Sequence, residues 1–526
     1  MTNNMIHRFK NTTCILLSAI SLLMLFSGCS KFLDRKPLTA TLDDLKQGSL
    51  EGQSYGLYSN LRYLAGFCSL PWLDFNSIRD DDAEKGSSLT DGNEITAEFE
   101  HFNYSKDDWA PNTYWNDHYA MINLANTELQ TADSLKAKDP ASLRNIGEAL
   151  FFRAYSYFEL VKAYGDVPLI NFRVYRASQA ILPKSPASVI YAQIDSDLAV
   201  AAQYLPQNWN NASGVSTFPG RLTSGAANTL WAQTYLFRAN WGRVIGLCQQ
   251  VINSGEYSLS STFAGVWKEG LNGAGKNGPE SIFEMQANVG ANKTNNNGSS
   301  WGTSQNIRQG GASVAWNLGW GWNTPTQNLV DAFDPADPRK NGTILFSGQS
   351  DDPTTGGFGA TLPPYDANGA NGGIQRKYWN KKVYSDPAVR SFTGMINNAG
   401  EAAWINKRIL RYADVLLMLA EASNETGDGA TAAKMVEKIR ARARNGNNNV
   451  LPAILYVNQG QMRTAIKNER RFEFAMEGYR FYDLVRWGDA DAVLAPLGYT
   501  YKNRFYPIPQ QAIDASNGVL KQNPDY

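Results

Sequence analysis

The stretch "ERRFEFAMEGYRFYDLVRWG", residues 469–488, combines four arginines, four acidic residues and six aromatic rings. In a helix its glutamates recur every four residues and form one stripe. An arginine stands three residues from Glu473, Glu477 and Asp483, a spacing at which side chains meet on a helix surface. Apolar residues supply the remaining face, and Gly478 is expected to join two helical segments. We therefore predict a structural, arginine-paired helical unit here rather than an active site.

Apolar residues at spacings of three and four predict further helices on both sides of this stretch. The segment 407–444 is expected to form two helices that break at Gly427. Upstream we predict two helical pairs, with the breaks between members set by turn residues such as Asp139-Pro140. The members of these pairs span residues 116–135 with 144–170, and 185–206 with 223–255.

Alanine-rich helical pairs with aromatic residues on their facing sides resemble tetratricopeptide units, which stack because one pair cannot bury its apolar face alone. We predict a mostly α-helical protein with about four such pairs and little β structure, its helical core lying mainly in residues 115–254 and 405–490. Residues 256–404 are rich in Gly, Asn, Thr, Pro and Trp, which disfavours regular helices. Their many aromatic residues favour ordered loops over disorder, and such loops are where binding residues tend to lie.

The first 28 residues predict a signal peptide. Three basic residues precede an apolar run at 14–26, which is too short to span a membrane, and Ser-Gly-Cys follows it at 27–29. Small residues directly before Cys29 are typical of a lipobox, in which the cysteine is acylated after cleavage. The alternative is an ordinary secretory peptide cleaved nearby. The mature chain would then be residues 29–526, which we treat as one domain.

Charge and cysteine content restrict the classes of partner and fold. The chain has 49 basic and 49 acidic residues, so nothing in its charge indicates nucleic-acid binding. Cys68 and Cys248 remain after removal of the signal peptide and lipid-acceptor positions, and the sequence leaves open whether they form a disulfide. An exported chain of this size with so few cysteines must be stabilised by its core.

Motifs for catalysis and metal binding are weak. The sequence has no HExxH, CxxC, EF-hand loop or GxSxG, so we expect no catalytic residue, metal or other cofactor. Structural calcium is not indicated, and the sequence leaves open whether calcium assists binding. The acidic run "SIRDDDAEKGSS", residues 77–88, could supply an acid and a base for glycoside hydrolysis through Asp81 or a neighbour. Adjacent side chains in a loop point in different directions, so we favour a turn or hydrogen bonding to ligand, and hydrolysis stays an alternative.

Aromatic residues in polar segments are the stronger functional signal. Sugars pack their C–H faces on aromatic rings while amides and carboxylates bind the hydroxyl groups. The stretch "YSKDDWAPNTYW", residues 104–115, places Trp109 and Asn112 beside two aspartates. Trp301 and Trp316 stand in the Gly/Asn-rich segment. We predict that these four residues contribute to a glycan site, with packing in the core as the alternative for the rings.

Six separated segments together resemble the SusD/RagB family of Bacteroidetes outer-membrane nutrient-binding lipoproteins. The resemblance covers essentially the whole chain and lies in the order and spacing of its parts. These are "CSKFLDRKP" (29–37), "RAYSYFELVKAYGDVPL" (153–169), "NTPTQNLVDAFDPADPR" (323–339), "RYADVLLMLAEA" (411–422), the stretch at 469–488 and "PIPQQAIDASNGVLKQNPDY" (507–526).

The resemblance implies a helical body that supports an irregular ligand-facing half, a lipid on Cys29 at the cell surface, and a SusC-like TonB-dependent transporter as partner. It implies capture of an oligosaccharide without catalysis, and a peptide-capturing member remains the alternative. Trp109 with Asn112 matches a Trp-x-x-Asn arrangement of the starch-binding member. The loop that contains Asp81 and Lys85 lies where that member makes polar ligand contacts. The glycan itself stays open.

Overall fold

The structure is a computed structural model that describes residues 49–88, 98–270, 273–289, 296–309, 316–369, 373–388 and 404–526. The chain divides into two units at Ser49, and the unit Leu50–Tyr526 contains the fold described below. The predicted signal peptide and Cys29 lie outside the described residues. No helix in the described ranges combines the length and apolarity that crossing a membrane requires.

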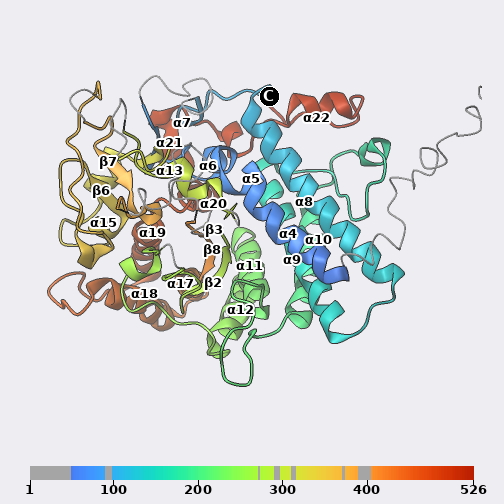
Figure 1. The fold of residues 1–526 in the computed structure, drawn as a ribbon, viewed down its shortest axis with the longest axis horizontal. Coiled ribbons are helices and arrows are strands. Elements are labelled where there is room, and N and C mark those ends of the chain that lie inside the picture. The colour runs from blue at the N-terminus through green and yellow to red at the C-terminus, as the bar shows by residue number, and fades with distance from the viewer. Residues whose placement is uncertain are drawn as a thin grey trace, which may run out of the picture. The chain divides into compact units, whose positions relative to one another are not determined.

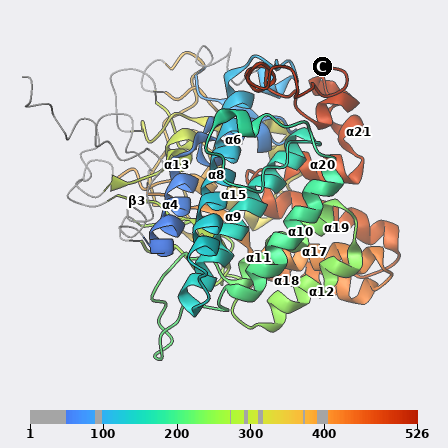
Figure 2. The ribbon, with the colours of Figure 1, turned by 90° about the vertical axis from the view of Figure 1, so that its right-hand side faces the viewer.

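A chain of antiparallel helices forms the body of the second unit (Figures 1 and 2). Each helix packs against the next along the chain, and α12 packs against α17 across the intervening loop-rich segment. The prediction of a mostly helical fold with paired helices is confirmed. The helices of this stack are α8 (Trp109–Ser134), α9 (Pro140–Tyr164), α10 (Ala187–Tyr204), α11 (Ser224–Phe237), α12 (Trp241–Asn253), α17 (Tyr412–Glu425), α18 (Gly429–Arg444) and α19 (Gln459–Phe474).

Helix α9 shows why these segments form helices. Asp139 caps its first turn by accepting hydrogen bonds from the backbone N–H groups of Ala141 and Ser142, and Pro140 occupies the first position, where no N–H donor is needed. Every residue from 147 to 161 is buried, because α8, α10 and residues of further elements, such as Phe283 of the loop-rich segment, pack against the helix. Gly165 then ends it with a φ of 74°.

The segment 223–255 differs from the prediction, because it forms two helices instead of one. Helix α11 ends at Phe237 and α12 begins at Trp241. Ala239 has a positive φ of 51°, and the Asn240 side chain accepts a hydrogen bond from the Arg243 N–H. A left-handed residue followed by an N-cap stops one helix and starts the next. The expected breaks after 135 and at Gly427 are confirmed.

Three helices before residue 80 were not predicted: α4 (Ser49–Tyr63), α5 (Ala65–Cys68) and α6 (Leu70–Asn76). Helices α5 and α6 pack against α8. Their apolar residues are too few for a clear helical period, so packing against the body stabilises them. Cys68 ends α5, and both Cys68 and Cys248 are buried free thiols, which settles the pairing that the sequence left open.

The segment between α12 and α17 holds short strands and short helices joined by ordered loops. Its strands form two-stranded antiparallel sheets, and one of them, β5 (Trp322–Pro325), pairs with β1 (Ala83–Gly86), which comes before α8 in the chain. The other sheets pair β2 (Ser281–Met285) with β8 (Lys407–Arg411), β3 (Asn288–Val289) with β4 (Asn296–Asn297), and β6 (Ile344–Phe346) with β7 (Tyr378–Asn380). The short helices here are α13 (Ser300–Gln305), α14 (Gln327–Ala332) and α15 (Pro338–Thr343). The others are α7 (Glu98–Glu100), α20 (Arg480–Trp487), α21 (Ala490–Leu494) and α22 (Gln510–Ala515).

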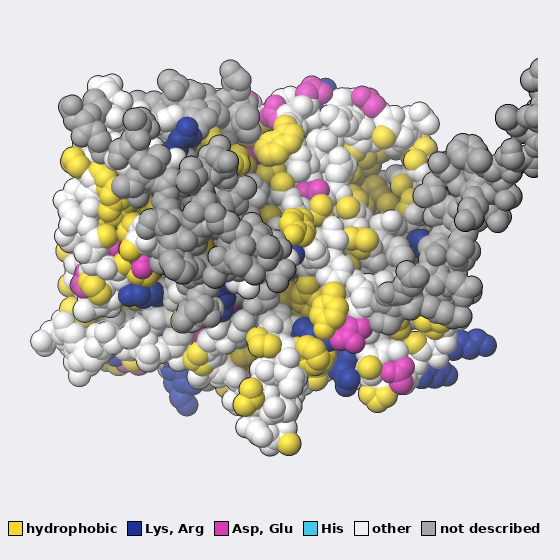
Figure 3. Space-filling model, viewed as in Figure 1, with side chains coloured by type: hydrophobic (Ala, Val, Ile, Leu, Met, Phe, Trp, Pro, Cys, Tyr) yellow, Lys and Arg dark blue, Asp and Glu magenta, His cyan; other side chains and the backbone are white. Residues whose placement is uncertain are grey.

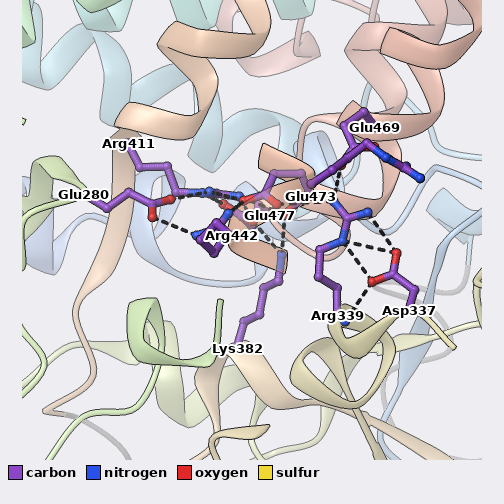
Figure 4. Close-up of polar contacts among 10 residues, drawn as sticks. Glu280, Asp337, Arg339, Lys382, Arg411, Arg442, Glu469, Glu473 and Glu477 are labelled. Carbon is purple, nitrogen blue, oxygen red and sulfur yellow. Dashed lines mark hydrogen bonds and ion pairs between the residues drawn. The ribbon is translucent and has the colours of Figure 1, made fainter. Parts of the chain in front are cut away.

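Buried ion pairs join this loop-rich segment to the helical body through α19 (Figure 4). Glu473 is fully buried and accepts hydrogen bonds from Arg411 Nη1 (2.7 Å) and from Arg442. Lys382, from the loop-rich segment, donates to Glu477 at 2.6 Å. Arg339 on α15 pairs with Glu469 at 2.5 Å. Charges from four separate elements therefore converge on α19 and on Glu477 directly after it.

The prediction that each acid pairs with an arginine three residues away is therefore mostly wrong. Arg470 pairs with Asp414 and Asp483, and Arg480 pairs with Asp81. Helix α19 ends at Phe474, so the residues after it no longer follow one helical surface, and each side chain meets a partner from another element. Arg486 with Asp483 is a pair that does have the local spacing. The structural role predicted for residues 469–488 is confirmed by this burial.

Gly478 connects the two helical segments, as expected. Its φ is 80°, and a Cβ at this position would lie 2.4 Å from Cη2 of Trp72. Only glycine therefore allows both the left-handed backbone and the contact with α6. This junction turns α20 away from α19, so that Arg480 faces the loop at Asp81.

Candidate functional site

Trp109 is the first residue of α8 and lies on the surface, with 49% of its area exposed. Asn112 follows it by three residues, on the same face of the helix. The Oδ1 atom of Asn112 is buried and accepts no hydrogen bond from the described residues. The sequence therefore places an exposed ring beside an amide whose acceptor is unsatisfied. Both belong to a long, packed helix, which holds them rigidly.

Asn112 also lines a groove of about 530 Å³ that follows α8 away from Trp109. Asn116, Tyr119 and Asn123 continue the same face of α8 along it. The opposite wall consists of residues 168–182 and of α22 near the C-terminus. The groove thus offers amides in a row beside an apolar wall, and Trp109, which does not line the groove, stands one helical turn before Asn112.

Asp81 lies in a buried network of charges. Its carboxylate accepts hydrogen bonds from Arg480 Nε at 2.8 Å and from the Asn328 amide at 3.1 Å. Arg471 pairs with Asp82 next to it. Burial favours the neutral acid, but the hydrogen bonds and charge of Arg480 outweigh it and lower the pKa of Asp81. This carboxylate is therefore ionised and satisfied by arginines, a state that suits neither a general acid nor a free ligand contact.

Lys85 is buried on β1, and its ammonium donates to the carbonyl of Ser88 at 3.2 Å. The ammonium also lies 5.7 Å from the ring of Trp322 on β5. The neighbouring Glu100 accepts a hydrogen bond from the Lys85 N–H, and burial, with the nearby charge of Glu84, raises the pKa of Glu100 to about 8. These contacts hold Ser88 and Glu100 against the strand pair β1–β5.

Trp301 is 7% exposed and packs edge-on against Trp72, with ring centroids 5.2 Å apart. The Lys407 ammonium lies 4.9 Å from its ring. Its ring is part of the main hydrophobic core, and no face of it is open to a ligand. Trp316 is half-buried and packs against a small separate cluster that includes Leu318 and Trp379. The structure therefore does not bring Trp301 or Trp316 to the surface around Trp109.

The described residues hold no group of three or more His, Cys, Asp or Glu side chains placed to bind a metal ion. His118 is buried between the rings of Phe67 and Tyr114, and burial lowers its pKa to about 3. A neutral, enclosed imidazole of this kind suits the core. What the site can do chemically is stack on a flat apolar face and exchange hydrogen bonds with a polar ligand.

Sequence reasoning missed the loop between α10 and α11, residues 205–223, because it looked for Gly/Asn-rich loops with aromatic residues only beyond residue 256. The loop carries Trp209 and the exposed Phe218 among asparagines and glycines. This loop has the same Asn- and Gly-rich, aromatic composition as residues 256–404, and that signal could have identified it.

Comparison with known proteins identifies the fold and the family. The model of the SusD family matches residues 279–501, and a model described as "Starch-binding associating with outer membrane" matches residues 72–236. SusD-like protein P2 of Formosa agariphila is 26% identical over 473 residues, which are 85% of this chain and 87% of that protein.

Solved structures agree over almost the whole chain. A laminarin-binding SusD-like protein is 25% identical with a TM-score of 0.71, and the match covers 91% of this chain and 99% of that one. Surface glycan-binding protein A from Bacteroides thetaiotaomicron, in complex with laminarihexaose, has a TM-score of 0.69 at 20% identity, with coverages of 90% and 98%. The second likeness concerns the fold alone. Family models, relative and fold together show that this chain belongs to the SusD/RagB family.

Proposed function

We propose that this protein is a non-catalytic, surface-exposed glycan-binding protein that captures oligosaccharides at the surface around Trp109 and Asn112. The observation that carries the proposal is the exposed ring of Trp109 beside the unsatisfied acceptor of Asn112 at the end of a groove. A sugar ring can stack on the indole while its hydroxyl groups bind amides along α8. A laminarin-binding protein of the same fold and family supports this class of ligand.

We further propose that a lipid on Cys29 tethers the protein to the outer membrane and that it delivers its ligand to a SusC-like TonB-dependent transporter. The Ser-Gly-Cys sequence before residue 30 supports the tether. The matching family description, which names association with the outer membrane, supports the location. The transporter is inferred from family membership. Radiolabelled palmitate incorporation, lost in Cys29→Ala, tests the tether, and copurification of a transporter barrel tests the partner.

Titration calorimetry of residues 30–526 with laminarihexaose, other oligosaccharides and a peptide mixture tests the ligand. Loss of one stacked ring costs at least about 1 kcal/mol, so Trp109→Ala should weaken glycan binding at this site at least about 5-fold. Trp109→Phe retains a ring and should lose less. Leu455→Ala removes an exposed apolar side chain elsewhere and serves as control. Unchanged affinity in Trp109→Ala would refute this site, and binding of peptides alone would replace the ligand class.

A further inference from the structure

A second cleft lies at the other end of the helices from Trp109. It has a volume of about 1440 Å³, and its walls are the loop 205–223 on one side and β2 with residues 286–288 on the other. In Figure 1, α8 begins at the upper edge of the view, whereas the loop between α10 and α11 hangs at the lower edge. Figure 3 shows hydrophobic side chains beside charged ones on the lower part of this face.

Contacts along helix α9 show how far the surface at Trp109 lies from the loop 205–223 along the helical body. The Tyr164 hydroxyl donates to the carbonyl of Pro111 near Trp109, at 2.9 Å. Sixteen residues earlier on the same helix, Glu148 pairs with Arg221 of the loop, at 2.7 Å. At 1.5 Å per residue these contacts are about 24 Å apart. The groove beside Asn112 and this cleft share no lining residue, so a ligand in the cleft occupies a distinct site.

The loop that forms one wall is held in place by its own hydrogen bonds. Trp209 Nε1 donates to the carbonyl of Leu222 at 2.8 Å, and the Thr217 N–H donates to the carbonyl of Trp209 at 2.9 Å. The Asn208 amide donates to Glu256 at 2.9 Å. Gly220 lies so close to Gln286 that a Cβ would approach its side chain to 2.4 Å. A wall fixed in this way loses little conformational entropy when a ligand binds.

Aromatic rings gather at the base of this loop. Phe218 is 40% exposed and meets Trp209 edge-on, with centroids 5.4 Å apart. The Arg221 guanidinium lies 4.3 Å from the centroid of Trp209 and 5.3 Å from that of Tyr55 on α4, which is 45% exposed. The stacked arginine fixes the rings, and the exposed faces of Phe218 and Tyr55 remain open to solvent.

The charges of the cleft are largely compensated, whereas its amides are many. Arg221 pairs with Glu148 and Glu51, and Lys276 lies 3.6 Å from Glu269 while donating to two backbone carbonyls. Arg62 also lines the cleft and has no acidic partner among the described residues, but Glu256 lines the cleft too, so an anionic ligand finds little net positive charge here. Amide side chains, which both donate and accept, line the walls: Gln207, Asn208, Asn210, Asn277, Gln286, Asn288 and Asn297.

We infer that this cleft is a second binding site for a neutral oligosaccharide, with Phe218 as the stacking ring and Asn210 as a hydrogen-bonding partner. Its volume exceeds the roughly 300–1,000 Å³ of common small-ligand pockets, which suits several sugar units in a chain. The inference rests on the proposed function, since it assigns the same class of ligand to another place. Two separate sites hold a long glycan more tightly than either alone, because the second contact becomes intramolecular.

The test compares wild type, Trp109→Ala, the cleft variant Phe218→Ala/Asn210→Ala, and the combination of both, with Leu455→Ala as control. Laminarihexaose is titrated by calorimetry, and retardation in gels that contain laminarin reports binding of the long polymer. We expect Trp109→Ala to retain residual hexasaccharide binding. The combined variant should bind the hexasaccharide at least 5-fold more weakly than Trp109→Ala does. The cleft variant alone should lose polymer retardation more than hexasaccharide affinity.

The outcomes separate the two proposals. If the wild type binds glycan and Trp109→Ala abolishes all binding, the second site is refuted and the proposed function stands. If the wild type binds no oligosaccharide, the proposed function fails. If the cleft variant loses affinity for a peptide mixture but not for glycans, the cleft takes peptides and the inference is overturned. Circular dichroism and an unchanged melting temperature show that each variant is folded, as expected for substitutions of exposed side chains.

Discussion

Replacing Glu473 by Gln should destabilise the protein strongly, although it changes only one oxygen to an amide nitrogen. Glu473 is fully buried and contacts three arginines: Arg411, Arg442 and Arg339. The cluster of Figure 4 is balanced, since the acids at 280, 337, 469, 473 and 477 face Arg339, Lys382, Arg411, Arg440 and Arg442. The substitution leaves one uncompensated positive charge in the core, which costs about 3–5 kcal/mol.

The melting temperature provides the assay. For the 477 residues from Leu50 to Tyr526, an unfolding entropy of about 2.1 cal/mol/K per residue gives about 1 kcal/mol per kelvin. Glu473→Gln should therefore lower the melting temperature at pH 7 by about 3–5 °C. The matched control is Glu425→Gln, because Glu425 pairs at 2.6 Å with Arg463, whose side chain is 41% exposed. Such a pair contributes no more than about 1 kcal/mol, or about 1 °C.

The pH dependence distinguishes lost charge from altered packing. Burial favours the neutral acid, but the charges of Arg442 and Arg411 outweigh it and hold the pKa of Glu473 well below its usual value. A carboxyl whose pKa is lower in the folded state contributes stability above its unfolded pKa of about 4.3 and loses that contribution as the pH falls. The difference in melting temperature between the wild type and Glu473→Gln should therefore become smaller below pH ~4. A melting temperature equal to that of Glu425→Gln at pH 7 would refute the reasoning.

Two further predictions concern the junction and the buried histidine. Gly478→Ala should destabilise the protein by roughly 2–4 kcal/mol, because the added Cβ would lie 2.4 Å from Trp72. Gly488 also has a positive φ, but no atom lies within 4 Å of its added Cβ, so the control Gly488→Ala should cost only about 1 kcal/mol. Equal melting temperatures of the two variants would contradict this prediction. Burial lowers the pKa of His118 to about 3 in the folded state. As the pH falls below 6.5, the imidazole therefore binds a proton in the unfolded state before it does so in the folded state, and the free energy of unfolding of the wild type should fall by about 2 kcal/mol between pH 6.5 and 5. His118→Phe should not show this loss in thermal unfolding, and a parallel pH profile would disprove it.

Regular helices could be predicted because their signals are local. The period of apolar residues locates α8 and α9, since a helix is formed by neighbours in the chain, although α8 begins seven residues before the predicted 116 and α9 ends six residues before the predicted 170. The break at Ala239 was missed, because a left-handed alanine has no distinct sequence signal. Helices α5 and α6 were also missed, since their stability comes from contact with α8 rather than from their own pattern.

The exposure of aromatic rings could not be predicted from composition. Trp109 and Trp301 both stand in polar stretches, yet the first is half-exposed and the second is covered by Trp72 and Lys407. The difference arises from residues more than one hundred positions away in the chain. In the same way, Phe218 became a candidate for binding only when the loop 205–223 was seen to face β2 across a cleft.

The sequence by itself determined the family, the helical body and the structural role of residues 469–488, because periodicity and motif order are properties of the chain. Only the tertiary structure decided which partners those charges take and which rings meet solvent. Glu473 binds Arg411, Arg442 and Arg339 from three different elements, none of them its neighbour along α19. Long-range pairing depends on how the elements pack, and packing is the sum of many weak contacts that no short stretch of sequence contains.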